Sequence, residues 1–327
     1  MRDLSTAPPE ASGADAALSS FRDDVLRGLR QRQKAIPSKY LYDARGSELF
    51  DQITRLEAYY PTETERAILT DNVAEIAAAI GERAVVVEYG SGSSDKTRTL
   101  LDALAGTLAA YVPIDISPTA LDEAAGRLRD RYPGVPVRPV VADYTRPLAL
   151  PDLPPHDHVT VFFPGSTVGN FTSDEARAFF AQAAAVAQAG RGTGGLLIGA
   201  DQRKALSVLI PAYDDPEGVT AAFNLNLLAR VNRELCADFD LGLWRHEARW
   251  NEGESRIEMH LVSAAEQTAT VAGETFRFAP GETIHTEIST KYGPDDLAAL
   301  ASGAGWIRRD RWTDAQGWFA VERYTLG

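Results

Sequence analysis

A glycine loop directly after an apolar run is the first feature of this chain that could do chemistry. Residues 84–87 read Ala-Val-Val-Val, and Glu88 then leads into Gly90 and Gly92. Glycines at such a point let the backbone turn sharply and approach a ligand closely, as in the nucleotide-binding loop of an open α/β sheet. The third glycine of a dinucleotide fingerprint is absent, so the loop suits a ligand without a pyrophosphate.

Two further acids end the next two apolar runs. Asp115 follows the run from residue 109, and Asp143 follows the run from residue 137. An acid at the first of these positions can take both hydroxyls of a ribose, and the second can accept from an adenine amino group. Glycine loop, ribose acid and adenine acid thus arrive at the ends of three successive strands, which predicts a nucleoside site.

The strands and helices that position these residues alternate from residue 84 to about 200. Such alternation predicts a parallel sheet covered on both faces, with ligands bound outside the carboxyl ends of its strands. We expect strands at 84–89, 109–114, 136–142, 157–163 and 194–200, and helices near 95–105, 118–131 and 173–188.

The alternation of strands and helices ends after residue 201. Apolar residues at helical spacing predict a helix at 219–235, and short runs of alternating apolar and polar residues from 243 to 288 predict an antiparallel meander. A helix at 294–304 and a hairpin formed by 306–312 and 318–324 close the chain. We predict an α/β fold with a second, smaller α+β domain. The predicted parts are a disordered tail (1–19), the α/β domain (61–210 with 289–327) and a substrate domain (20–60 with 211–288).

Composition narrows the classes of partner. There are 33 basic and 46 acidic residues, a net charge of −13, which disfavours nucleic acid. No apolar run is long enough to cross a membrane, and no signal pattern opens the chain, so we expect a cytoplasmic protein. Cys236 is the single cysteine, and the five histidines lack ligand spacing, so no metal is predicted.

Seven motifs carry a resemblance to a known family: residues 39–43, 59–65, 88–92, 163–171, 212–215, 258–259 and 284–292. The acid-Gly-x-Gly loop and the closing hairpin resemble the class I S-adenosylmethionine-dependent methyltransferases, with their Rossmann-like sheet. With all seven motifs, the chain from about residue 20 onward resembles the histidine-specific methyltransferases, which trimethylate the α-amine of L-histidine to hercynine, the first step of ergothioneine biosynthesis.

The resemblance implies S-adenosylmethionine as the cofactor. Lys96 matches a family position near the methionine end, where it can pair with the carboxylate. Tyr144 stands where a phenylalanine is expected, and stacking on adenine should survive that change. The implied cofactor-binding residues are Gly90, Gly92, Lys96, Asp115, Asp143 and Tyr144.

Asn170 and Tyr60 are the implied catalytic residues. Asn170 follows the fourth strand, and in the resembled family this residue holds the substrate amine. An amide oxygen accepts from the amine without adding a charge that would keep it protonated. The ring of Tyr60 can face a methylated ammonium. The alternatives are a simple loop turn at Asn170 and a packing role for Tyr60.

Four more residues are implied to bind the substrate. Tyr213 can donate to the substrate carboxylate, and Glu287 and Ser289, two apart on one strand, can engage the two nitrogens of an imidazole. Met259 can line the same pocket. The alternatives are a polar turn at Tyr213, an exposed strand face at Glu287 and Ser289, and a core position for Met259.

Other functions stay open at this point. The same chemistry on another amine, such as tryptophan, is one alternative, although a carboxylate at Glu287 would lack a suitable partner beside a plain indole. A nicotinamide-dependent oxidoreductase is another, against which the missing third glycine and the closing hairpin count. We expect a monomer that acts on a small molecule.

Overall fold

The computed structural model describes residues 13–90 and 95–327. The chain divides into two compact units. The α/β unit comprises Tyr59–Leu209, Asn251–Arg256 and Ser289–Gly327. The second unit comprises the described residues up to Ala58, together with Ile210–Trp250 and Ile257–Ile288.

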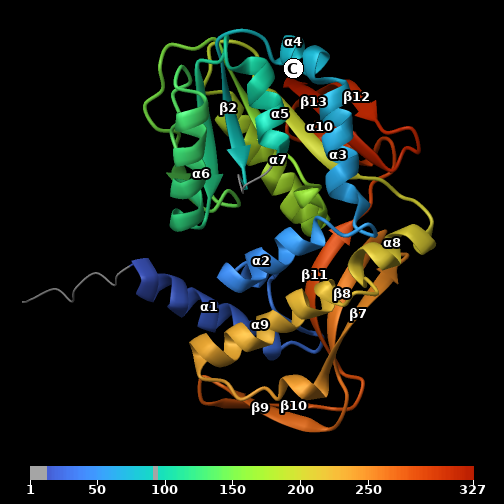
Figure 1. The fold of residues 1–327 in the computed structure, drawn as a ribbon. Helices are drawn as coiled ribbons and strands as arrows, with labels where there is room; N and C mark the ends of the chain where they lie inside the picture. Colours follow the sequence, from blue (N-terminus) through green and yellow to red (C-terminus); the bar gives the residue numbers. More distant parts are fainter. Residues whose placement is uncertain (1–12, 91–94) are drawn as a thin grey trace, which may run out of the picture. The chain divides into compact units, whose positions relative to one another are not determined.

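A seven-stranded sheet forms the centre of the α/β unit (Figure 1), in the order β12-β13-β6-β5-β2-β3-β4. The five strands from β6 to β4 in this order run parallel to one another, while β13 pairs antiparallel with both β6 and β12. Their bounds are β2 (Ala84–Tyr89), β3 (Ala110–Asp115), β4 (Val140–Val141), β5 (His158–Phe163), β6 (Gly195–Asp201), β12 (Trp306–Thr313) and β13 (Phe319–Leu326).

Alternation along the central strand divides the core between the two faces of this sheet. Val85 and Val87 pack on the side of α7 and α10, whereas Ala84 and Val86 pack on the side of α3 to α6. Both faces are buried, which explains the unbroken apolar run of β2. The helices are α3 (Tyr60–Asp71), α4 (Val73–Ile80), α5 (Asp95–Leu104), α6 (Pro118–Arg131), α7 (Ser173–Ala187) and α10 (Asp296–Ser302), with the 3-10 turn η2 (Thr167–Asn170) after β5.

The second unit is built on a four-stranded sheet ordered β1-β11-β8-β7, with a separate β9-β10 hairpin. Its strands are β1 (Lys34–Ala35), β7 (Trp244–Asn251), β8 (Arg256–Ser263), β9 (Gln267–Val271), β10 (Glu274–Phe278) and β11 (Thr283–Thr290), of which β7, β8 and β11 extend into the α/β unit. Its helical segments are α1 (Gly13–Leu29), η1 (Ser38–Leu41), α2 (Ala44–Ile53), α8 (Leu206–Tyr213, which begins in the α/β unit), α9 (Val219–Leu235) and η3 (Leu241–Leu243).

The predicted α/β class is confirmed, and two local differences have physical reasons. The strand expected at 136–142 shrinks to β4 and one bridge at Val137, because Pro136 and Pro139 cannot donate to a ladder. Helix α1 starts at Gly13, inside the expected tail, since this stretch is rich in alanine, a strong helix former. Within the described residues, no helix combines the length and apolar character needed to cross a bilayer.

Candidate active site

Gly90 and Tyr144 lie together at the carboxyl end of β2. Gly90 has a φ of +70°, the left-handed conformation that favours glycine. A side chain at this position would meet the Tyr144 ring at 3.9 Å. That ring stacks on Tyr89 with centroids 5.5 Å apart and an interplanar angle of 6°. Gly90 therefore has a flat aromatic wall beside it, while Gly92 falls outside the described residues.

The two predicted carboxylates lie close to the same tyrosine. Asp115 ends β3 and accepts from the Ser117 backbone N–H at 2.9 Å, and burial raises its pKa. Asp143 follows β4 and accepts from the Thr145 N–H at 2.9 Å. The pKa of Tyr144 is raised chiefly by burial, and further by the charges of Asp115 and Asp143. An aromatic face beside two carboxylates fits a nucleoside with its ribose hydroxyls and amino group.

Lys96 forms a buried ion pair instead of standing open. Its Nζ lies 2.6 Å from Oε2 of Glu65 on α3. The same carboxylate accepts from the Gly165 N–H, at 2.8 and 3.0 Å, in the loop after β5. Glu65 thus joins α3, α5 and that loop, and Lys96 lies where the three meet. Its predicted contact with the cofactor's carboxylate stays a prediction.

Glu88 is a buried acid to which sequence reasoning gave no role. Its carboxylate accepts from the Thr97 hydroxyl at 2.8 Å and from the Tyr111 hydroxyl at 2.5 Å. Burial raises the pKa of Glu88 to about 7, because it outweighs these two donors and the nearby charge of Lys96. An acid inside an apolar strand was the sequence signal for this environment.

Tyr60 is the first residue of α3, where the proline that follows it is tolerated because the first turn leaves N–H groups unused. Its hydroxyl donates to Asp201 Oδ2 at 2.6 Å and accepts from Lys204 Nζ at 2.7 Å. The same ammonium lies 4.4 Å from the centroid of the Tyr60 ring, which also packs edge-to-face on Trp318. The ring that was predicted to face a cation therefore already has one beside it.

Contacts through two fully buried charged side chains, Lys291 and Asp201, connect Ser289 with Tyr60. Lys291 donates to Ser289 Oγ at 2.8 Å and lies 2.8 Å from Asp201 Oδ2. Sequence reasoning assigned no role to Asp201, Lys204 or Lys291. The position of Asp201 at the end of β6 could have indicated a role, because an acid at the carboxyl end of a strand is the pattern that indicated Asp115 at the end of β3.

The loop that carries Asn170 is fastened to the same place. Ser166, with a left-handed φ of 55°, accepts from the Asp201 N–H at 2.9 Å. The Tyr292 hydroxyl donates to the Val168 carbonyl at 3.0 Å. A non-glycine residue held in this conformation stores strain, which concentrates at functional sites. The loop that ends at Asn170 is thus held against the segment that follows β11.

The remaining predicted residues belong to the second unit. Tyr213 ends α8, and its carbonyl accepts from His246 Nε2 at 2.7 Å. Met259 on β8 is buried, and its carbonyl accepts from the Thr286 hydroxyl at 3.0 Å. Glu287 is half-buried on β11. Their part in a substrate site stays a prediction.

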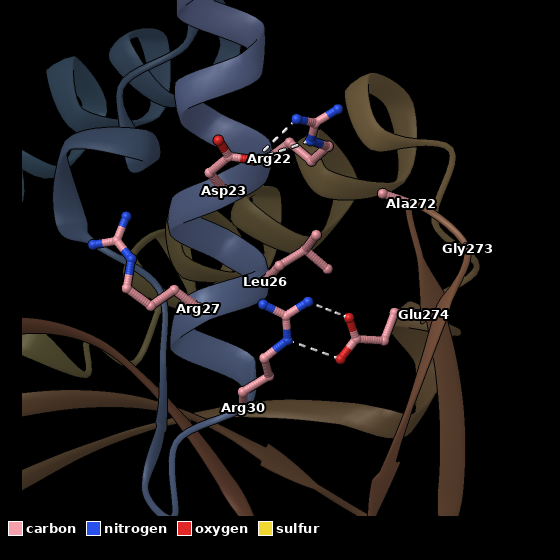
Figure 2. Close-up of a pocket in the computed structure, with 8 residues that line it drawn as sticks. All are labelled: Arg22, Asp23, Leu26, Arg27, Arg30, Ala272, Gly273 and Glu274. Atoms are coloured by element: carbon pink, nitrogen blue, oxygen red, sulfur yellow. Dashed lines mark hydrogen bonds and ion pairs between the residues drawn. The ribbon is translucent and has the colours of Figure 1, made fainter.

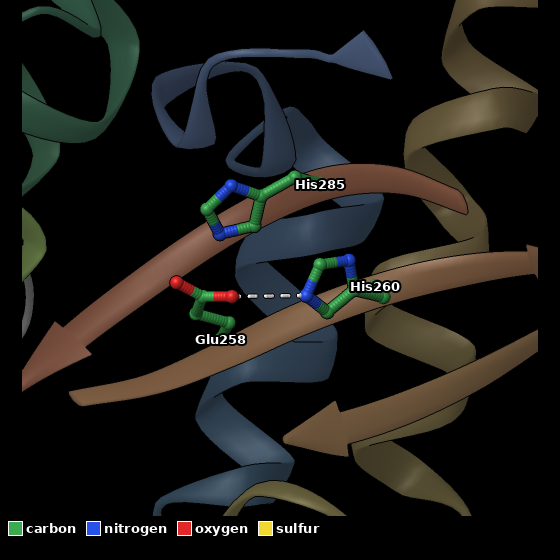
Figure 3. A group of neighbouring side chains, drawn as sticks. All are labelled: Glu258, His260 and His285. Atoms are coloured by element: carbon green, nitrogen blue, oxygen red, sulfur yellow. Dashed lines mark hydrogen bonds and ion pairs between the residues drawn. The ribbon is translucent and has the colours of Figure 1, made fainter. Parts of the chain in front are cut away.

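Figure 3 shows a second cluster that strand pairing creates in this unit, formed by Glu258, His260 and His285. His260 Nε2 lies 3.3 Å from Glu258, and the two imidazole rings stack at 4.9 Å. Burial lowers the pKa of His260 to about 4, as do His285 and Arg249. We assign no metal to it, because Arg249 adds positive charge and His260 Nδ1 lacks the partner, among the described residues, that supports a metal-bound imidazole.

A surface pocket lies elsewhere in the second unit (Figure 2). It contains a bidentate ion pair between Arg30 and Glu274, both exposed. Exposed ion pairs of this kind contribute little to the stability of the fold. The pocket is lined by Arg22, Asp23, Leu26, Arg27, Arg30, Ala272, Gly273 and Glu274, none of which was a predicted site residue.

Comparison with known proteins decides the family. A family model described as histidine-specific, S-adenosylmethionine-dependent methyltransferase matches residues 21–325. The chain belongs to this family. This methyltransferase is 44% identical to the histidine N-alpha-methyltransferase of Mycolicibacterium smegmatis, over 94% of the chain and 95% of that protein. It is 42% identical to the Mycobacterium tuberculosis protein of the same name, over 94% and 96%. The L-tryptophan methyltransferase of Psilocybe serbica is 27% identical, over 92% and 91%.

The family membership confirms the predicted methyltransferase activity and S-adenosylmethionine as its cofactor. The residues at the carboxyl ends of β2, β3 and β4 fit this cofactor, since they combine a glycine turn, an aromatic wall and two carboxylates. In this methyltransferase two further lysines with buried side chains, Lys204 and Lys291, surround Asp201 at the end of β6.

Proposed function

We propose that this methyltransferase transfers three methyl groups to the α-amine of L-histidine, giving hercynine, as the first step of ergothioneine biosynthesis. The observation that carries the proposal is the identity of 44% and 42% to two histidine N-alpha-methyltransferases over nearly the full length of all three chains. The family match also removes the support for a nicotinamide-dependent oxidoreductase.

When bound, S-adenosylmethionine supplies an electrophilic methyl group, and its transfer to an amine lone pair breaks the carbon–sulfur bond and leaves a neutral thioether. The residues of this chain have to supply position and a suitable electrostatic environment. Gly90 leaves room for close approach, the Tyr144 ring offers a stacking face, and Asp115 and Asp143 offer acceptors for hydroxyl and amino groups.

The substrate nitrogen must lose one proton before each of the three transfers, because an α-ammonium has a pKa of about 8 even in a peptide and no lone pair while protonated. We propose that Asn170 accepts a hydrogen bond from the amine through its amide oxygen. A neutral acceptor holds the nitrogen without raising its pKa as a carboxylate would. The Asn170 loop is suited to this task because Ser166 Oγ accepts from the Asp201 N–H and the Val168 carbonyl accepts from the Tyr292 hydroxyl.

We propose that Glu287 and Ser289 recognise the imidazole. A carboxylate accepts from the ring N–H, and a hydroxyl can donate to the other nitrogen. Tyr213 would donate to the substrate carboxylate, and Met259 would form an apolar wall. An indole offers one N–H and no second ring nitrogen, so this pair of residues favours histidine over tryptophan.

The test is to incubate the pure chain with S-adenosylmethionine and each of the twenty amino acids, and to follow product masses. We expect a gain of three methyl groups on histidine. The Glu287→Ala variant should lose roughly 10- to 150-fold in kcat/KM for histidine, the size expected for a hydrogen bond to a charged group. Glu274→Ala, on the exposed Arg30 ion pair, serves as the matched control and should behave as the parent.

Two results would contradict the proposal. One is a methylated product from tryptophan or another amino acid with none from histidine. The other is equal loss of histidine activity in the Glu287→Ala and Glu274→Ala variants. Calorimetry with S-adenosylhomocysteine should give the same affinity for both variants, which would show that neither substitution disturbs cofactor binding.

A further inference from the structure

We propose that Lys204 and Lys291, held together by Asp201, are positioning residues of the substrate site: Lys204 orients Tyr60, and Lys291 orients the Ser289 hydroxyl as a hydrogen-bond donor. This inference deepens the proposed function and rests on it. The three charged side chains are almost completely inaccessible to solvent, with exposed fractions of 4%, 0% and 0%.

Lys204 is held in one orientation because each of its three ammonium hydrogens has an acceptor. Its Nζ donates to the Tyr60 hydroxyl at 2.7 Å, to the Gln202 carbonyl at 2.7 Å, and to Asp201 Oδ1. The Tyr60 hydroxyl then donates to the second oxygen of Asp201, at 2.6 Å. The closed ring of Lys204, Tyr60 and Asp201 fixes both the hydroxyl and the plane of the aromatic ring.

Lys291 determines the direction of the hydrogen bond at Ser289. An ammonium has no lone pair, so Ser289 Oγ must be the acceptor in their 2.8 Å contact. The hydrogen of that hydroxyl is consequently directed toward a different acceptor. A hydroxyl arranged in this way can donate to the unprotonated nitrogen of a neutral imidazole, while Glu287 accepts from the protonated one. Lys291 thereby selects the neutral form of the histidine side chain.

Charge explains why the arrangement depends on pH. Lys291 and Lys204 hold the pKa of Asp201 below its ordinary value, although burial acts in the opposite direction. Burial lowers the pKa of Lys204 to about 8, against the attraction of Asp201 and Asp314 and with the repulsion of Lys291. Above this pH Lys204 loses a proton, and one of its three hydrogen bonds with it.

A pair of double-mutant cycles tests the proposal with the full chain. Lys204→Met should lower kcat/KM for histidine roughly 10- to 150-fold in the parent, and by no more than about 3-fold when Tyr60 is already phenylalanine. In the second cycle, Lys291→Met should cause the same large loss when Ser289 is present and the same small loss when Ser289 is already alanine. Either single lysine substitution leaves Asp201 paired one to one, so the fold is expected to survive, and the affinity for S-adenosylhomocysteine shows whether it has.

Equal losses in both backgrounds would overturn the proposal, because a merely structural lysine acts independently of Tyr60 or Ser289. If a variant does not bind S-adenosylhomocysteine, the pH profile of the parent decides instead. Because the substrate amine titrates in the same range, the parent is compared with Tyr60→Phe: we expect the ratio of their kcat/KM values to fall above about pH 8 as Lys204 deprotonates, and a constant ratio would contradict the network. If the parent methylates another amino acid, the proposed function fails, but the same cycles can be measured with that substrate.

Discussion

Two buried acids of the same sheet, Glu88 and Asp201, differ in the charge of their partners. Glu88 lies near the end of β2 and Asp201 ends β6, and both have an exposed fraction of 0%. Glu88 is held by the neutral hydroxyls of Thr97 and Tyr111, and its pKa rises to about 7. Asp201 is held by two ammonium groups, and its pKa falls below the ordinary value.

The difference shows that burial alone does not determine the state of an acid. Desolvation acts on both side chains in the same direction, and the partners decide which effect is larger. On β2, neutral hydrogen-bond donors leave the pKa of Glu88 close to 7, so at pH 7 its carboxyl group is only partly ionised. At the end of β6, Asp201 stays ionised and can organise the groups around it.

The largest expected effect comes from removing the charge of Asp201. Asp201→Asn leaves Lys204 and Lys291 buried without a counterion, so we expect the free energy of unfolding to fall by about 3–5 kcal/mol. Glu88→Gln removes a group that is near neutrality at pH 7 and should cost about 1 kcal/mol. Urea unfolding at pH 7 measures both, and similar losses for the two variants would invalidate the contrast.

A smaller effect concerns the pH dependence of stability at Glu88. Its pKa is raised in the folded protein, so between about pH 4.5 and 7 the folded state binds more protons than the unfolded chain. The stabilisation from Glu88 is complete below that window and is lost as the pH rises through about 7, by at most about 3 kcal/mol. Unfolding at pH 5 and pH 8 should therefore show a larger decline for the parent than for Glu88→Gln. Parallel declines would show that Glu88 is ionised throughout.

The smallest expected effect comes from the Tyr60 hydroxyl. Tyr60→Phe removes a hydrogen bond to a buried carboxylate and should lower the free energy of unfolding by about 1–2 kcal/mol. Tyr132→Phe is the matched control, because its hydroxyl donates at 2.6 Å to Asp102, whose side chain is 50% exposed. Water can replace that bond, so we expect less than about 1 kcal/mol. Equal losses would mean that burial adds nothing to the bond of Tyr60.

The positions of Gly90, Asp115 and Asp143 at the carboxyl ends of parallel strands were predictable because they depend on local rules. Glycine turns and acids that end apolar runs have fixed positions in the sequence, whereas the contacts of these residues with the cofactor stay a prediction. Strand periodicity likewise located β2, β5 and β6 to within one residue.

The charged network could not be predicted because it depends on long-range packing. Asp201 meets Lys291 and Tyr60 only after β6, β11 and α3 have come together, at sequence separations that no local pattern reports. Glu258 and His285 likewise become neighbours only through the sheet order, so histidine spacing along the chain gave no sign of their cluster.

The site of methylation on histidine tests the central claim most directly. Histidine labelled with ¹⁵N at the α-nitrogen, incubated with the chain and ¹³C-methyl S-adenosylmethionine, can be followed by nuclear magnetic resonance. We predict a single trimethylammonium signal whose methyl carbons couple to the labelled nitrogen. Methyl carbons attached to the imidazole ring, or no labelled histidine product at all, would contradict the account.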